Sequence, residues 1–92
     1  WTPLYMASWE GHVEVVKALL GAEADVNEST NVGMTPLYRA SSVGHVEVVK
    51  ALLAAEAEVN KSTNSGMTPL RIAISHSHLE VAAVLREAGG HE

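Results

Sequence analysis

Apolar side chains recur at helical spacing along short stretches of this chain. In residues 44–53 four of them follow one another at intervals that place them on one side of a helix: Val46, Val49, Leu52 and Leu53. Glu47 and Lys50 lie between these positions and are expected to point outward as a favourable charged pair. The pattern therefore predicts an amphipathic helix with one buried stripe.

A second, shorter helix is predicted just before it. Thr35 suits the N-cap position, because its hydroxyl can accept a hydrogen bond from a backbone N–H that the helix leaves unpaired. Pro36 follows at the first helical position, where a missing N–H does no harm. The helix is expected to run to about Val43 and to end at Gly44. The stretch from residue 54 to residue 67 is rich in Asn, Ser, Thr and Gly, which predicts a turn or hairpin.

The whole pattern repeats every 33 residues. Residues 1–33 and 34–66 are identical at 25 of 33 positions, and the sequence GHVEVVKALL occurs twice without a change. Residues 67–92 match the second copy at 11 of 26 positions. One short helix pair cannot bury its own apolar stripe, whereas a stack of similar pairs can. The sequence therefore predicts an all-α solenoid that forms one domain over 1–92, with repeats at about 1–29, 30–62 and 63–92.

The repeated motifs resemble those of the ankyrin repeat family over essentially the whole chain. They are G-x-T-P-L at 33–37 and 66–70, G-H-V-E-V-V-x-x-L-L twice, and A-D-V-N or A-E-V-N afterwards. The resemblance implies stacked antiparallel helix pairs, hairpin loops that project sideways, and a concave face that binds proteins. The family usually has histidine after T-P-L, where this chain has Tyr5, Tyr38 and Arg71. The contacts of that histidine are therefore expected to be rebuilt or weakened.

A second departure lies after the second helix of each repeat. The family places glycine there, because the chain leaves the helix in a left-handed conformation. Here the first two copies have Glu23 and Glu56, and the third keeps Gly89. A side chain in that conformation costs roughly 1 kcal/mol or more. We expect strain at both glutamates; a pair of carboxylates for a basic partner is the alternative.

The two flanks of the solenoid are expected to differ. In the third copy Arg86 replaces a leucine of the apolar stripe, which suits a terminal repeat that faces water. The first copy keeps the interior pattern, so its outer flank is expected to expose valine and leucine side chains. Such a surface predicts either a longer solenoid or self-association through the uncapped N-terminal repeat.

Recognition is expected at the few positions that vary in an otherwise constant scaffold. The first two copies differ at eight positions, and Trp1, Trp9, Glu10 and Val32 among them map to hairpin tips and to the inner end of the first helix. Tryptophan is a favoured interface residue, and methionine adds adaptable apolar surface. The predicted partner-binding residues are Trp1, Trp9, Glu10, Asn31, Val32, Met34, Ser42, Val43, Asn64, Ser65, Met67, Ser75 and His76. In the alternative, Trp1 covers the flank of the first repeat and Met34 packs into the next hairpin.

The composition and net charge of the chain argue against several classes of partner and site. The net charge is −5, and the six Lys and Arg residues are scattered, which argues against nucleic acid. No apolar run approaches the roughly 18 residues of a membrane span, and no segment resembles a signal peptide. The chain has no cysteine, which excludes disulfides and zinc–thiolate sites and is compatible with an intracellular, cytoplasmic location.

Catalysis and cofactors are not expected. His12, His45 and His78 occupy the same place in each copy, which indicates a structural role in the loop. His76 and His78 could bind a metal ion, but the sequence offers no third ligand nearby. The sequence therefore predicts a protein-binding module without an enzymatic activity. The near-identity of two copies leaves an engineered or consensus-like scaffold that folds or self-associates as the alternative.

Overall fold

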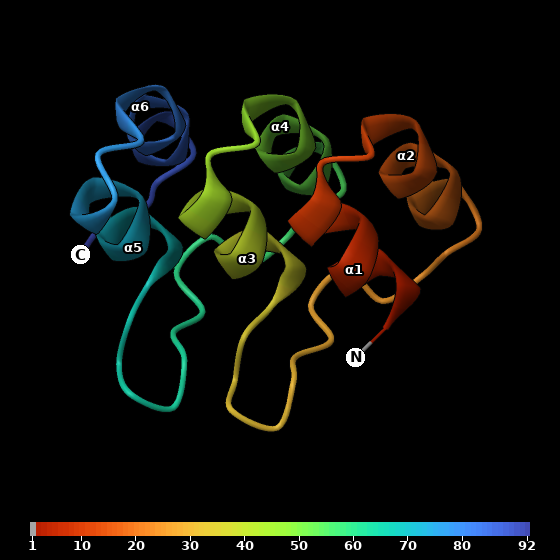
Figure 1. The fold of residues 1–92 in the computed structure, drawn as a ribbon, viewed down its shortest axis with the longest axis horizontal. Coiled ribbons are helices and arrows are strands. Elements are labelled where there is room, and N and C mark those ends of the chain that lie inside the picture. Colours follow the sequence, from red (N-terminus) through yellow and green to blue (C-terminus); the bar gives the residue numbers. More distant parts are fainter. Residues whose placement is uncertain (1) are drawn as a thin grey trace.

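The computed structural model describes residues 2–92, and Trp1 lies outside the described residues. Those residues form six helices and no strand, in three antiparallel pairs that follow one another in chain order (Figure 1). The helices are α1 (Pro3–Glu10), α2 (Val13–Gly21), α3 (Pro36–Val43), α4 (Val46–Ala54), α5 (Pro69–Ser75) and α6 (Leu79–Glu87). The predicted all-α repeat fold is confirmed.

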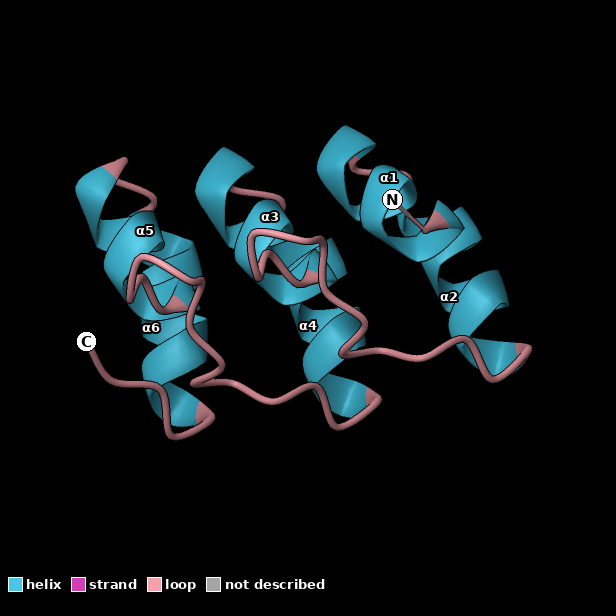
Figure 2. Ribbon diagram, turned by 90° about the horizontal axis from the view of Figure 1, so that it is seen from below, coloured by secondary structure: helices cyan, strands magenta, loops and turns pink. Residues whose placement is uncertain are grey.

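The pairs stack so that the helices form two layers. In one layer α1 packs on α3 and α3 on α5, while in the other α2 packs on α4 and α4 on α6. Figure 2 shows the three pairs side by side, and in Figure 1 two long loops project from the starts of α3 and α5. Each pair thus buries its apolar surface against its neighbours.

The local signals of the first helix act as the sequence predicts. Thr35 has an extended backbone, and its Oγ1 accepts a hydrogen bond from the Tyr38 N–H at 3.1 Å. Pro36 is the first residue of α3, and Gly44 ends the helix in the left-handed conformation at φ 83°. The equivalent residue of the third copy, Ser77, has φ 62°, so a non-glycine residue takes the left-handed conformation there as well.

The second helices end in the left-handed turn that the sequence predicts. Glu23 and Glu56 both have φ 67°, and Gly89 has φ 92° at the equivalent position. The Ala24 N–H donates to the Leu19 carbonyl at 3.0 Å, closing the turn around Glu23. This pairing satisfies a carbonyl that the helix end would otherwise leave without a partner. The turn geometry is therefore regular, and the two glutamates adopt the backbone conformation that suits glycine.

The core lies between neighbouring repeats. Val49 and Leu52 of the predicted stripe are fully buried. Val48, which the stripe did not include, is also buried at 1% exposure, because α4 packs on α2 of the preceding repeat. Its equivalent in the first copy, Val15, is 49% exposed. The second helix of a repeat therefore buries this valine where a preceding repeat packs against it, as Val81 of α6 does too.

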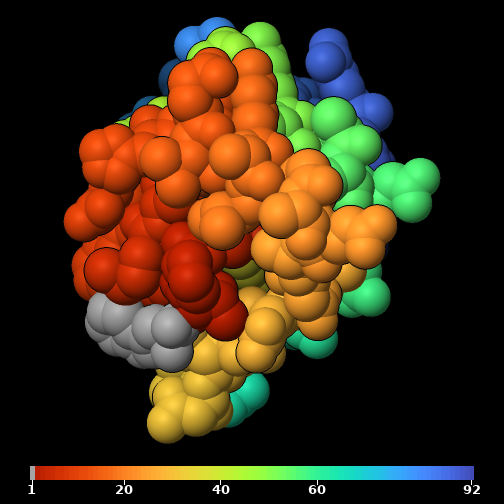
Figure 3. Space-filling view, turned by 90° about the vertical axis from the view of Figure 1, so that its right-hand side faces the viewer, coloured from red at the N-terminus to blue at the C-terminus, as the bar shows by residue number. Residues whose placement is uncertain are grey.

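The outer flank of the first repeat is hollowed (Figure 3). A depression of about 170 Å³ lies between the start of α1 and the segment after α2, with Leu4 and Leu19 in its wall and Asp25 and Glu28 at its rim. At the other end of the stack, Arg86 of α6 is exposed. Both flanks agree with the expectation that the first repeat presents apolar groups and the third a charged side chain.

Candidate functional site

The positions predicted to meet a partner lie largely on one side of the molecule. We call this side the first-helix face and define it as the exposed sides of α1, α3 and α5 together with the loops of residues 30–34 and 63–67. Both loops project from the starts of α3 and α5 (Figure 1).

The two projecting loops are closed and tied to each other. In the first, the Thr30 N–H donates to the Met34 carbonyl at 2.9 Å, as in a hairpin. The Asn64 N–H of the second donates to the Val32 carbonyl at 3.0 Å, and the Asn64 side chain donates to the Asn31 carbonyl at 3.2 Å. These bonds hold the tips in place, so the 47% exposed Val32 side chain is presented on an ordered support.

A cluster around Arg39 joins the first two repeats on this face. The Arg39 Nε donates to the Tyr5 hydroxyl at 2.9 Å, and its Nη2 donates to Met34 Sδ at 3.3 Å. The guanidinium carbon lies 4.4 Å from the centre of the Trp9 ring, within the range of a cation–π interaction. Trp9 in turn meets Tyr5 edge to face, with ring centres 6.1 Å apart. The arginine is therefore held from three directions.

In the first copy, Tyr5 of this cluster occupies the position where the ankyrin family usually has histidine after T-P-L. Tyr5 is 1% exposed, and its hydroxyl bonds to residues 29 and 34 positions further along the chain. The contacts are thus rebuilt between the first and second repeats. Tyr38 is buried in the same place of the second copy, whereas Arg71 is exposed in the third. Only the first of these positions has a hydroxyl paired with an arginine among the described residues.

Two of the three loop histidines, His45 and His78, connect adjacent repeats, as a structural role predicts, whereas the exposed His12 lies 3.3 Å from Glu10 of its own repeat. His45 Nε2 lies 3.1 Å from the Trp9 carbonyl, and His78 Nε2 lies 3.1 Å from the Ser42 carbonyl. His76 Nδ1 reaches the same Ser42 carbonyl at 2.9 Å. Carbonyls at the end of a helix lack partners within it, so these rings satisfy them.

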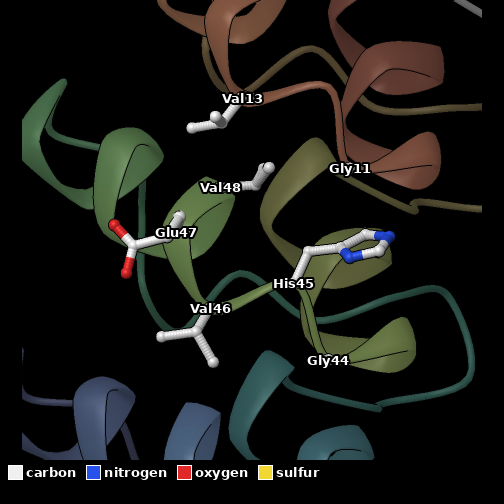
Figure 4. A pocket seen from close by; sticks show the side chains of 7 residues that line it. All are labelled: Gly11, Val13, Gly44, His45, Val46, Glu47 and Val48. Atoms are coloured by element: carbon white, nitrogen blue, oxygen red, sulfur yellow. The ribbon is translucent and has the colours of Figure 1, made fainter.

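The His45 ring lies against Gly11 at one end of a groove (Figure 4). A Cβ on Gly11 would lie 2.7 Å from this ring, and Gly11 has φ 79°, so the close approach and the backbone conformation both favour glycine. The groove has a volume of about 430 Å³ and valine side chains in its wall, with Glu47 pointing away from the ring in Figure 4. Across residues 2–92, no group of three or more His, Cys, Asp or Glu side chains lies close enough to hold a metal ion.

Charge is unevenly distributed between the two layers of helices. Lys17 pairs with Glu14 at 3.8 Å on α2, and Lys50 pairs with Glu47 at 3.6 Å on α4, as the sequence predicts. The first helices carry only Arg39, Arg71 and Glu10 as charged residues other than histidine, and neither projecting loop carries a charge. The other ten of the eleven acidic residues lie on the second helices or in the segments after them. The first-helix face is therefore slightly basic on an acidic protein.

The structure places twelve of the thirteen predicted partner-binding residues. The exposed ones are Glu10, Asn31, Val32, Asn64, Ser65, Ser75 and His76, and the half-buried ones are Trp9, Met34, Val43 and Met67. Trp1 lies outside the described residues. Ser42 is buried at 6% exposure, and its hydroxyl donates to the Arg39 carbonyl at 2.7 Å. We leave Ser42 out of the proposed surface, because its side chain is already occupied within the helix.

The predicted set omits Arg39, which the structure places against Tyr5, Met34 and Trp9 on this face. The sequence does contain a signal for Arg39, because residue 39 is one of the eight positions at which the first two copies differ. Its equivalent in the first copy is Met6. The omission has a physical reason. The contacts that bring Arg39 to Trp9 and Tyr5 join residues 30 and 34 positions apart, which helical periodicity within one repeat does not describe.

Comparison with known proteins supports the repeat architecture. A family model described as ankyrin repeats (3 copies) matches residues 4–92. No curated protein sequence matches the chain. Within residues 2–92, none of the helices combines the length and the apolar character that a membrane span requires.

Proposed function

The chain belongs to the ankyrin repeat family, and on this basis we propose that it binds a protein partner through the first-helix face and performs no catalysis. Ankyrin repeats are generally protein–protein interaction modules. One observation on this chain carries the proposal. Of the eight positions that differ between its first two copies, five belong to the first helices or to the residues that precede them in the sequence: Trp1/Met34, Met6/Arg39, Trp9/Ser42, Glu10/Val43 and Val32/Ser65.

The side chains at these positions suit protein recognition. Trp9 and Met34 are half-buried, so each keeps apolar surface that a partner can cover. Val32 is 47% exposed at a tip whose backbone is bonded to the next loop. Because the supporting loops are already ordered, binding orders few additional groups. Less of the interaction energy is therefore offset by the entropy cost of ordering the loops.

A pull-down from a cell lysate with three baits tests the proposal. The first bait is the parent chain, and the second carries Trp9→Ser and Val43→Glu, which exchange each residue for its equivalent in the other copy. The third carries Val15→Ala and Leu79→Ala, which remove exposed apolar side chains from the second helices. We expect proteins that bind the parent and the third bait but not the second, with all three baits folded by circular dichroism.

Two results would contradict the proposal. Proteins that bind all three baits equally would not be using the first-helix face. Proteins lost only from the third bait would place the binding surface on the second helices.

Self-association is a second candidate function, supported by the apolar flank of the first repeat. Val15 is 49% exposed there, whereas its equivalents Val48 and Val81 are buried by neighbouring helices. A second copy that covers this flank would bury Val15 and the depression beside Leu19. Light scattering over a concentration series tests this candidate. A mass that rises with concentration for the parent but not for Val15→Glu supports it, and a monomer at all concentrations refutes it.

A further inference from the structure

We propose that the Arg39 cluster is a receptor for one carboxylate of the partner, an aspartate or glutamate side chain flanked by apolar residues. This inference rests on the proposed function, because it names the chemistry that the first-helix face recognises. Lys17 and Lys50 each have a glutamate within 4 Å on their own helix, whereas Arg39, like Lys61, Arg71 and Arg86, forms no ion pair with any described residue, and of these four Arg39 is the one on the first-helix face that aromatic side chains hold in place.

The guanidinium still has hydrogen-bond donors to offer. Of its nitrogens, Nε donates to the Tyr5 hydroxyl and Nη2 to Met34 Sδ, while Nη1 donates to no described residue. A guanidinium has five N–H groups in a planar fork, and two of them in parallel match the two oxygens of a carboxylate. Arg39 is half-buried, so its charge is only partly compensated by water. A carboxylate would supply the partner that this charge lacks.

The cluster also holds the fork in one place. The centre of the Trp9 ring lies 4.4 Å from the guanidinium carbon, and the hydrogen bonds to Tyr5 and Met34 hold the guanidinium nitrogens. A flexible arginine loses side-chain freedom when it binds, but one that is already held loses little. The arrangement therefore favours a ligand that meets Arg39 at a defined angle.

The surroundings specify what lies next to the carboxylate. Val32, Val43, Met34 and Trp9 present apolar surface on the same face. The face carries few charges, but the protein as a whole has a net charge of −5, which repels strongly acidic chains. One carboxylate among apolar side chains satisfies both conditions, whereas a polyacidic segment or a nucleic acid does not.

Selection from a random dodecapeptide library displayed as N-terminal fusions tests the inference, because the only carboxylates of such peptides are side chains. We expect peptides with a single Asp or Glu among apolar residues. Their affinity, measured on synthetic amidated peptides, is expected to fall about 10-fold to 100-fold in Arg39→Met, the range of hydrogen bonds to a charged group. Met6 is the equivalent residue of the first copy, so the fold accommodates methionine there. Arg86→Met removes the same charge from the exposed side of α6 and is expected to change the affinity less than about twofold.

A double-mutant cycle then identifies the contact. Replacing the acidic residue of the peptide by its amide should weaken binding to the parent but leave binding to Arg39→Met unchanged. Equal losses with both proteins, or selected peptides without an acidic residue that still depend on Trp9 and Val43, would overturn the carboxylate site and leave the proposed function standing. Peptides unaffected by Trp9→Ser with Val43→Glu, or no selected peptide at all, would count against the first-helix face itself and against this site with it.

Discussion

Replacing the two left-handed glutamates by glycine is expected to stabilise the protein. Glu23 and Glu56 both have φ 67°, where the third copy has glycine at φ 92°. A residue with a Cβ in this conformation costs about 1–2 kcal/mol relative to glycine. Glycine is also more flexible in the unfolded chain, which offsets about 0.4–1 kcal/mol of that gain at each site. The net gain is therefore expected to be about 0.5–1 kcal/mol for each replacement.

The two replacements should add, because the glutamates belong to different repeats and share no contact in the described structure. From the backbone conformation alone, the doubly substituted chain is then more stable by about 1–2 kcal/mol. For a chain of this size, 1 kcal/mol raises Tm by about 4–8 °C, so a rise of roughly 5–15 °C is expected. Thermal unfolding followed by circular dichroism measures it directly.

A matched control separates backbone strain from charge. Both glutamates follow the C-terminal end of a helix, where a negative charge is unfavourable by about 0.3–1 kcal/mol. Glu23→Ala with Glu56→Ala removes the same two carboxylates but keeps a Cβ in the left-handed turn. The alanine pair should therefore gain clearly less than the glycine pair. Equal Tm values for the two pairs, or no rise with glycine, would refute the strain argument.

Three further changes probe the scaffold. Ser41→Ala is expected to raise the free energy of unfolding by about 1 kcal/mol, because the buried Ser41 hydroxyl has no hydrogen-bond partner in the described structure; a lower urea midpoint would contradict this. Thr35→Ala should lower the free energy of unfolding by about 1–2 kcal/mol, because the cap to the Tyr38 N–H is lost, and Thr35→Ser should keep most of this stabilisation. An alanine variant as stable as the parent would contradict the role of the cap. Asn27→Ala removes the acceptor of the Glu58 N–H at 2.9 Å, a bond between repeats, so hydrogen exchange of that amide should become faster; unchanged exchange would show that this bond adds no protection.

Local sequence determines the helices and their ends in this protein. The Thr-Pro pair begins each first helix, and Gly44 stops α3 in the left-handed conformation, as the residue types alone predict. The left-handed turn at Glu23 and Glu56 also follows from position within the repeat, although both residues are unsuited to it. Hydrogen bonds that span three to five residues control these features, so the sequence of one repeat contains the information.

Burial and the candidate site depend on tertiary structure instead. The two GHVEVVKALL segments form two helices of equal length, α2 and α4. Val15 of α2 is nevertheless 49% exposed, whereas the equivalent Val48 of α4 is 1% exposed. Since the letters are identical, the difference comes from α4 packing on α2 of the preceding repeat, whereas no described helix packs on the equivalent side of α2. Arg39 likewise gains its partners, Tyr5 and Trp9, from a different repeat. The sequence by itself determined the repeating unit, because helix formation is local; the stacking decided which surfaces remain free, because burial depends on neighbours far away along the chain.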